Sequence, residues 1–384
     1  MNNFPLATHR RQFPALENKA YFNYGGQGPL PSPAMEAIAR SYEFVQVGGP
    51  FSQKINGWVQ QEVALTREAI AAELGVESGT VTLTEDVTVG CNIALWGIDW
   101  QNGDHLLISD CEHPGVVATV REIRRRFNVE VSVCPLLETL NEGNPVEAIA
   151  AQLQSNTRLL VISHILWNTG QVLPLKEIVE TCHARGVRVL ADAAQSVGVL
   201  PLKLAETGVD FYAFTGHKWL CGPEGLGGLY VSPEARSHLS PTFIGWRGVE
   251  VDAKGTPLDW QPDGRRYEIA TSAYPLLGGL REAIALHNNW GTAAQRYGQI
   301  CDLSRYLWER LSELPRVECL RTAPPEAGLV SFKLTDGTPH KQAVTALEGE
   351  QIMVRTILDP DCIRACVHYF TEKSEIDQLI ARLK

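Results

Sequence analysis

Short apolar runs alternate with amphipathic stretches between about residues 80 and 235. Residues 116–126 and 175–185 have the periodicity of helices, and the apolar runs are HLLIS (105–109), VEVSVC (129–134), RLLVIS (158–163), VRVLA (187–191), FYAF (211–214) and GGLYV (227–231). Continuous apolar strands that alternate with helices are typical of a mostly parallel sheet covered on both faces. We therefore predict an α/β fold whose functional side chains follow the carboxyl ends of the strands.

A stretch rich in proline, glycine and polar residues, 251–268, interrupts this pattern and predicts a boundary. Beyond it, residues 276–291, 294–314 and 373–383 have helical periodicity, and LVSFKL, QIMVRTI and CIRACVHYF have the character of strands. These elements predict a smaller α+β domain. We expect residues 21–255 to form a large domain, and residues 1–20 and 256–384 to form the small one.

Composition and charge narrow the class of protein. The chain has 384 residues, 44% hydrophobic and 20% charged, and a formal net charge of −10. These values are ordinary for a soluble globular protein. The acidic balance, with no basic run beside an aromatic stripe, excludes nucleic acid as an expected partner. The run Arg124–Arg126 is better explained as the exposed end of a helix.

The cysteines indicate a reducing compartment. There are nine, scattered and without a C-x-x-C pair, so we predict neither a disulfide framework nor a metal site, and expect most of them to be small buried hydrophobes. No apolar run reaches transmembrane length, and the N-terminal segment lacks the apolar core of a signal peptide. We expect a cytoplasmic protein with no membrane partner.

Two residues carry the candidate chemistry. Asp192 directly follows the apolar run VRVLA, and Lys218 lies 26 positions on, just after FYAF. Alone, Asp192 is as easily a helix N-cap and Lys218 a solvated surface residue. Together, on neighbouring strand ends, they suit pyridoxal 5′-phosphate, which needs a lysine amine for its Schiff base and a carboxylate to keep its ring nitrogen protonated.

The motifs DAAQ (192–195) and TGHKWLCGPEGLG (215–227) closely resemble those of the NifS-like class V aminotransferases. This group of fold-type I enzymes depends on pyridoxal phosphate and includes the cysteine desulfurases. The resemblance extends from YFNYGGQGPLP (21–31) to residues 363–380. It implies a mostly parallel central sheet between helices and a smaller α+β C-terminal domain.

The resemblance also implies roles in cofactor binding. Lys218 is expected to bind the cofactor covalently and to act as the catalytic base, with Asp192 paired to the ring nitrogen. His113 is expected to stack on the ring and to move protons, although a lone histidine is more often structural. Gln195 is expected to bind the phenolic oxygen; the alternative is an exposed helix residue. The residues expected at the phosphate are Val87, Thr88, Thr215 and His217, with Thr271 supplied by the neighbouring subunit of a homodimer.

Four further residues are implied in substrate binding. Arg364 matches the arginine that binds the amino-acid carboxylate, and Arg355 is a candidate for a second acidic group or a structural ion pair. Asn168 lies one position out of register with a family asparagine near the cofactor. Trp246 either lines the partner's cleft or packs in the subunit interface.

The chain departs from the desulfurase pattern at one place. Only eight residues separate Arg355 from Arg364, which leaves no room for the family's loop with a nucleophilic cysteine. Cys362 and Cys366 flank Arg364 and are expected to pack rather than to react. The resemblance is therefore greatest to carbon–sulfur lyases of this family that act on cystine.

We accordingly expect α,β-elimination. Lys218 would remove the Cα proton, and cystine or cysteine would yield pyruvate, ammonia and a persulfide or sulfide for iron–sulfur clusters, delivered to an acceptor protein. A desulfurase that forms alanine and an epimerase or aminotransferase are the alternatives within the family. A cofactor-free scaffold protein is the non-enzymatic alternative, against which the intact Lys218 and Asp192 argue.

Overall fold

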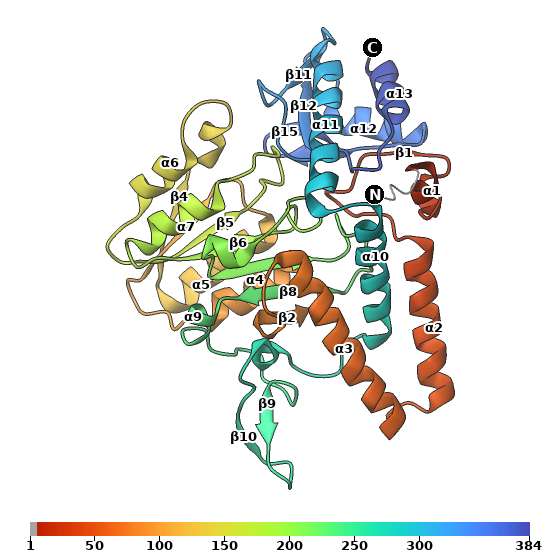
Figure 1. Cartoon of the computed structure of the whole chain (residues 1–384). Coiled ribbons are helices and arrows are strands. Elements are labelled where there is room, and N and C mark those ends of the chain that lie inside the picture. The colour runs from red at the N-terminus through yellow and green to blue at the C-terminus, as the bar shows by residue number, and fades with distance from the viewer. Residues whose placement is uncertain (1–5) are drawn as a thin grey trace.

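The computed structural model describes residues 6–384, and its largest feature is a seven-stranded sheet (Figure 1). Strands β3 to β7 run parallel to one another, whereas β8 is antiparallel to both β7 and β2. The predicted mostly parallel sheet is thus confirmed. The strands, in their order across the sheet, are β2 (Val81–Thr84), β8 (Gly227–Val231), β7 (Phe211–Thr215), β6 (Arg188–Asp192), β5 (Thr157–Ser163), β3 (His105–Ser109) and β4 (Glu130–Cys134).

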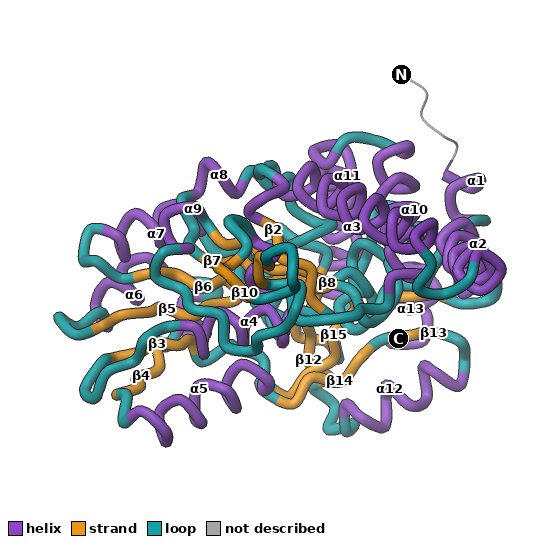
Figure 2. Tube along the Cα trace, turned by 90° about the horizontal axis from the view of Figure 1, so that it is seen from below, coloured by secondary structure: helices purple, strands orange, loops and turns teal. Residues whose placement is uncertain are grey.

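Helices cover both faces of this sheet (Figure 2). Leu106 belongs to the apolar core on one face and the next residue, Leu107, to the core on the other. Successive strand residues point to opposite faces, which is why the central strands are apolar throughout. The helices around the sheet are α4 (Val87–Gly97), α5 (Pro114–Phe127), α6 (Pro145–Gln152), α7 (Leu175–His183), α8 (Leu204–Thr207) and α9 (Pro233–Arg236).

Three long helices stand beside the sheet: α2 (Ser32–Gly48), α3 (Gln53–Leu74) and α10 (Leu277–Trp290). The α10 helix packs closely on α2 because Gly279 has no side chain; a Cβ there would lie 2.6 Å from Ile38. Arg281 of α10 pairs with Glu62 of α3 at 2.6 Å. We predicted α10 but neither α2 nor α3.

A second, antiparallel sheet lies near the C-terminus. Its order is β11 (Val317–Cys319), β12 (Leu329–Leu334), β15 (Asp361–Cys366) and β14 (Arg355–Leu358). The helices with it are α11 (Ala293–Ser312), α12 (His340–Gly349) and α13 (Lys373–Leu383). These elements agree with the predicted α+β region, and the domain boundaries themselves stay a prediction.

Two predicted segments differ in the structure. QIMVRTI is not one strand: β13 (Ile352–Met353) pairs in parallel with β1 (Ala20–Tyr21), and β14 starts at Arg355 and pairs with β15. The expected boundary at 251–268 overlaps a projecting hairpin of β9 (Val249–Val251) and β10 (Pro257–Trp260) (Figure 1). The remaining short helices are α1 (Leu6–Arg10), η1 (Pro14–Leu16), η2 (Ser78–Thr80), η3 (Leu136–Thr139), η4 (Gly264–Tyr267) and η5 (Tyr274–Leu276). Within residues 6–384, no helix combines the length and apolar character needed to cross a membrane.

Candidate active site

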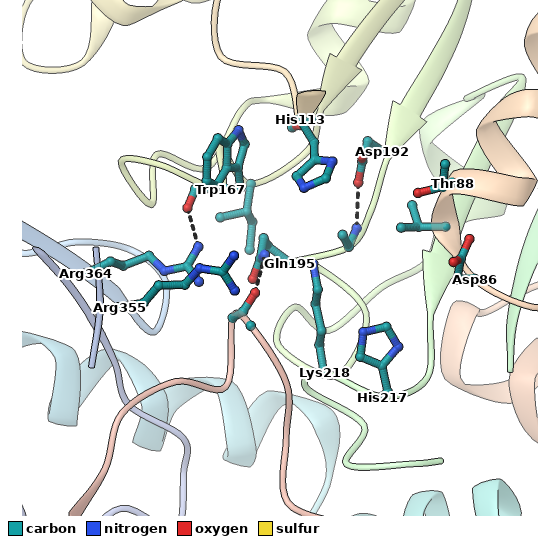
Figure 3. A pocket seen from close by; sticks show the side chains of 16 residues that line it. Asp86, Thr88, His113, Trp167, Asp192, Gln195, His217, Lys218, Arg355 and Arg364 are labelled. Atoms are coloured by element: carbon teal, nitrogen blue, oxygen red, sulfur yellow. Dashed lines mark hydrogen bonds between the residues drawn. The ribbon is translucent and has the colours of Figure 1, made fainter. Parts of the chain in front are cut away.

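A cavity of about 210 Å³ opens at the carboxyl ends of β5, β6 and β7 (Figure 3). Nine of the predicted site residues line it: Val87, Thr88, His113, Asp192, Gln195, His217, Lys218, Arg355 and Arg364. The other lining residues are Gly25, Gly26, Asp86, Ser163, Ile165, Trp167 and Ala194. Parallel strands end at one edge of the sheet, so residues far apart in the chain meet there.

Lys218 reaches the cavity from the loop after β7 and is partly buried. Burial is the largest cause that lowers its pKa, to about 8, and the Arg364 and Arg355 guanidinium groups act in the same direction. The Asp192 carboxylate opposes this shift. An amine with such a pKa is partly unprotonated near neutral pH, so Lys218 is a competent nucleophile and base.

Asp192 is the last residue of β6 and is only 5% exposed. Its Oδ1 accepts the N–H of Ala194 at 2.9 Å, in a turn rather than at the start of a helix, so the N-cap alternative is wrong. Burial raises the pKa of Asp192 and the Ala194 N–H lowers it, as do the positive charges of Lys218 and His113. In the described part of the chain Asp192 forms no ion pair, which leaves a buried carboxylate available to a cationic ligand.

His113 caps α5 and faces the cavity. Its Nδ1 accepts the N–H of Gly115 at 3.2 Å, so the neutral ring carries its proton on Nε2. The ring lies edge-on to Trp167, with centroids 5.6 Å apart. Burial lowers the pKa of His113, and the Lys218 charge lowers it further. His113 therefore has a structural role, as the cap of α5, and also lines the cavity.

Gln195 is 2% exposed, so the alternative of an exposed helix residue is wrong. Its Nε2 donates to the carbonyl of Gly25 at 2.9 Å, and its Oε1 accepts the indole N–H of Trp219 at 2.8 Å. A side-chain amide has two N–H donors, so one is left for a ligand.

The side of the cavity that holds Asp86 and Thr88 has the features of an anion site (Figure 3). Helix α4 begins at Val87, so its first N–H groups lack partners within the helix. Across from them, His217 lines the cavity, and its Nδ1 lies 2.6 Å from Thr215 Oγ1. Thr215 is buried behind His217 and does not itself line the cavity.

The opposite side holds the two arginines (Figure 3). Arg355 and Arg364 are direct cross-strand partners in β14 and β15. Arg364 is 1% exposed, its Nη1 donates to the carbonyl of Trp167 at 2.5 Å, and its buried Nε has no hydrogen-bond partner among residues 6–384. A Cβ at Gly25 would lie 2.8 Å from Arg364 Nη2, so only glycine leaves room for the guanidinium. Two cations side by side favour an acidic ligand.

The spacing between the two arginines is explained by a tight hairpin. Leu358 pairs with Asp361, so only two residues make the turn from β14 to β15. Cys362 and Cys366 are fully buried, as predicted, and burial raises the pKa of Cys362 to about 12. No cysteine is among the lining residues in the part of the chain that the structure describes.

Besides Thr215, three predicted residues lie outside this cavity. Asn168 is turned away, with its amide donating to the carbonyl of Asp359 at 3.1 Å. Trp246 is 63% exposed, beside a separate apolar hollow formed with the β9–β10 hairpin. Thr271 is exposed and lines another hollow, which it shares with Thr88. The roles of these three residues stay predictions.

Several lining residues were missed at the level of sequence. Asp86 gave a signal, because an acidic N-cap precedes α4 and accepts the N–H of Val89. Trp167 and Ser163 gave none, since the run ILWN looks like the end of an ordinary buried strand. Ser163 is held by Glu112, whose carboxylate accepts its hydroxyl and its N–H, both at 2.8 Å, and burial raises the pKa of Glu112 to about 8.

The cavity fits the predicted pyridoxal phosphate. Lys218 offers an amine and Asp192 a buried carboxylate. Neither side chain forms an ion pair in the described part of the chain, so both are available to the cofactor. The α4 N-terminus with His217 offers donors to an anion on one side. The Arg364 guanidinium, which lines the cavity, offers donors to a substrate carboxylate on the other.

Comparisons with known proteins found relatives that are similar over almost the whole chain. A solved complex between the cystine C-S lyase C-DES and its reaction product cysteine persulfide is 50% identical, covers 97% of this chain and 99% of its own, and superposes with a TM-score of 0.96. A lysine-to-alanine mutant of C-DES, with glycine covalently linked to the PLP cofactor, is 49% identical and covers 97% of this chain and 98% of its own, also with a TM-score of 0.96. The probable cysteine desulfurase of Methanothermobacter thermautotrophicus is 27% identical over 96% of this chain and 95% of its own length.

A family model supplies the assignment. Residues 20–379 match the model described as aminotransferase class-V. This range includes every residue that lines the cavity. The chain therefore belongs to the aminotransferase class-V family.

Proposed function

We propose that this protein is a pyridoxal-phosphate-dependent carbon–sulfur lyase that cleaves the Cβ–S bond of L-cystine. The observation that carries the proposal is the pair Arg355 and Arg364 at one end of a cavity that no cysteine of the described chain lines. Two cations suit the two carboxylates of cystine, and the missing thiol argues against a persulfide held on the enzyme. The similarity to C-DES, a cystine C-S lyase, supports the same conclusion.

Each residue has a task in this reaction. Arg364 binds the α-carboxylate of the scissile half, and Arg355 binds the carboxylate of the distal half. Lys218 and Asp192 hold the cofactor, which when bound withdraws electrons from the substrate Cα. The unprotonated Lys218 amine takes the Cα proton. His113 lies over the same space and is placed to move a proton at its Nε2.

The overall reaction balances without an oxidant. Cystine and one water give pyruvate, ammonia and cysteine persulfide; the Cβ–S bond breaks and its electron pair leaves with sulfur. A persulfide anion is a more stable leaving group than the sulfide that would leave cysteine. Cystine is therefore the better substrate, with cysteine as a poorer one.

We also propose a homodimer. Apolar side chains are exposed along one edge of the molecule, more than is usual for a monomer: Phe243 (63%), Ile244 (61%), Trp246 (63%), Val251 (53%) and Leu258 (68%). Thr271 lies in the hollow that adjoins Thr88, which suits a residue that reaches the phosphate site of the partner. Light scattering of the purified protein tests the dimer, and Trp246→Glu is expected to weaken it.

The destination of the sulfur follows from the product. A persulfide transfers its outer sulfur to thiols, which supports the predicted acceptor protein for iron–sulfur cluster assembly. The acceptor itself stays a prediction. The cytoplasm also stays a prediction. It is supported by the nine cysteines, all free thiols, a state that reducing compartments maintain.

Incubation of the purified protein with L-cystine tests the proposal. Pyruvate, alanine and persulfide are measured together, and visible absorbance reports the cofactor. We expect pyruvate and persulfide in equal amounts and no alanine. Alanine without pyruvate would mean a desulfurase, and an inverted or oxo product with sulfur retained would mean an epimerase or aminotransferase. A colourless protein that never takes up pyridoxal phosphate would support the scaffold alternative.

A further inference from the structure

Three buried histidines cluster against the loop that carries Lys218. His9 comes from α1, His287 from α10 and His368 from the segment after β15, and they are 2%, 3% and 0% exposed. The His287 and His368 rings stack with their centroids 5.4 Å apart. None of the three lines the cavity. Burying three imidazoles is costly unless their hydrogen bonds are satisfied.

Two of them bind the loop directly. His368 Nε2 lies 3.0 Å from the carbonyl oxygen of Trp219, and His287 Nε2 lies 2.9 Å from that of Leu220. A carbonyl only accepts, so both Nε2 atoms carry a proton. The Nδ1 of His368 accepts the N–H of Tyr369 at 3.0 Å, and the Nδ1 of His287 lies 2.6 Å from the Tyr369 hydroxyl. The His368 ring is therefore neutral with its tautomer determined, and burial, which lowers the pKa of His287 well below its ordinary value, makes that ring neutral as well.

The third histidine completes the chain of hydrogen bonds. Because the Tyr369 hydroxyl donates to His287, it accepts from His9 Nε2, which lies 2.8 Å away. Burial is the main reason that the pKa values of all three imidazoles are lowered. The pKa of His9 falls to about 4, that of His368 to about 3, and that of His287 well below its ordinary value. The network keeps its protons in place around neutral pH.

The loop around Lys218 is held at each successive carbonyl. The carbonyl of His217 accepts the N–H of Gly28 at 2.7 Å, and that of Lys218 accepts the N–H of Cys221 at 3.0 Å. The next two carbonyls are those held by the histidines. Gly28 sits so close that a Cβ would lie 2.1 Å from the Lys218 carbonyl oxygen. The histidines thus supply the two donors that the neighbouring backbone does not.

The same contacts reach a second residue of the cavity. The Trp219 ring lies against His368, with centroids 5.7 Å apart, and its indole N–H donates to Gln195 at 2.8 Å. A shift of Trp219 therefore moves both the lysine and the glutamine that line the cavity.

A metal site is the competing explanation. The Sγ of Cys221 and one nitrogen each of His287 and His368 lie within 4.8 Å of one another. Every nitrogen of the two rings already takes part in a hydrogen bond, so a metal ion would have to break bonds that hold the loop. The geometry favours hydrogen bonding.

We propose that His287 and His368 are positioning residues for Lys218: their Nε2–H groups hold the two carbonyls that follow the lysine and so determine where its amine stands in the cavity. The proposal rests on the role of Lys218 in the proposed function. A displacement of about 1 Å at a reacting group can cost on the order of 10²-fold in rate.

Paired substitutions in the holoenzyme test this. His368→Leu and His287→Leu remove the donors, whereas His368→Gln and His287→Gln keep an N–H at the position of Nε2. The pH titration of the visible absorbance of cofactor bound at Lys218 is the main measurement, with kcat and KM for cystine beside it. For the leucine variants we expect the titration midpoint to shift by at least about half a pH unit and kcat to fall at least about tenfold, with KM nearly constant. The glutamine variants should recover most of both.

Controls separate positioning from general stability. His105→Leu removes another buried, hydrogen-bonded histidine, at the opposite end of β3 from the cavity. It should lower the unfolding temperature without moving the titration. Tyr369→Phe removes the hydroxyl that donates to His287 with little change of side-chain volume. It therefore tests the network even if the leucine variants do not fold, and it should shift the titration midpoint as His287→Leu does.

Three results would overturn the proposal: an unchanged midpoint in Tyr369→Phe and in every folded leucine variant, glutamine variants as impaired as the leucine ones, or stoichiometric metal in the purified enzyme that His368→Leu loses. If the wild-type protein shows no cofactor absorbance, the proposed function fails instead. The two failures are therefore distinguishable.

Discussion

Replacing Arg355 distinguishes a dicarboxylate substrate from a simple amino acid. If Arg355 binds the distal carboxylate of cystine, Arg355→Gln impairs only substrates that carry that group. A hydrogen bond to a charged partner contributes about 1.5–3 kcal/mol. Arg355 is exposed at the rim of the cavity, so solvent screens it and the lower value applies. We expect kcat/KM for cystine to fall about tenfold.

The neighbouring arginine provides the matched control. Arg364 is 1% exposed, and in the proposed function it binds the carboxylate that every amino-acid substrate has. A buried pair takes the upper value, so Arg364→Gln should lower kcat/KM on the order of 10²-fold for every substrate.

The assay is pyruvate release from L-cystine and from β-chloro-L-alanine, which has one carboxylate and needs no thiol. Arg355→Gln should change the rate with β-chloroalanine by less than about threefold. Thermal unfolding confirms that both variants are folded. Equal losses on the two substrates in Arg355→Gln would refute the assignment of Arg355 to the distal carboxylate.

Three further predictions follow from the same cavity. In the enzyme without cofactor, the lowered pKa of Lys218 means that its protonated form destabilises the folded state below about pH 8. This cost disappears as the pH rises to 10.5, the ordinary pKa of a lysine. Lys218→Met should therefore raise the melting temperature at pH 7 more than at pH 10, and an equal gain at both would contradict the shift. Gly25→Ala places a methyl group 2.8 Å from Arg364 Nη2 and should raise KM for cystine at least about fivefold with the fold intact, as circular dichroism can check. Cys362→Ala and Cys366→Ala should keep pyruvate formation, because both thiols are buried; loss of activity in a folded variant would favour a thiol mechanism.

Local patterns in the chain were enough to predict the central sheet. The run HLLIS became β3 with the same bounds, and FYAF became β7 with Thr215 added. Both strands are buried on two faces, so the physical demand for apolar residues acts on every position. The meeting of Asp192 and Lys218 at one cavity was predictable for a related reason, since Asp192 ends such a strand and Lys218 lies three positions after another.

Other features depended on contacts between distant segments. QIMVRTI is apolar enough for one strand, yet its first half pairs with Ala20 and Tyr21 and its second half with β15. This division depends on hydrogen bonds to segments that are distant in the chain. The hairpin of residues 249–260 lacks a buried face, so its sequence has no alternation of apolar and polar residues from which the strands could be predicted.

Local order and spacing along the chain were enough to identify the class of fold, the lysine with its acidic partner, and the absence of room for a cysteine loop between the arginines. The folded arrangement was needed to show that Trp167 rather than Asn168 faces the cavity, and that three histidines lie behind Lys218. Side-chain direction at a strand end and the meeting of three remote segments are set by packing, and packing leaves no periodic trace in the chain.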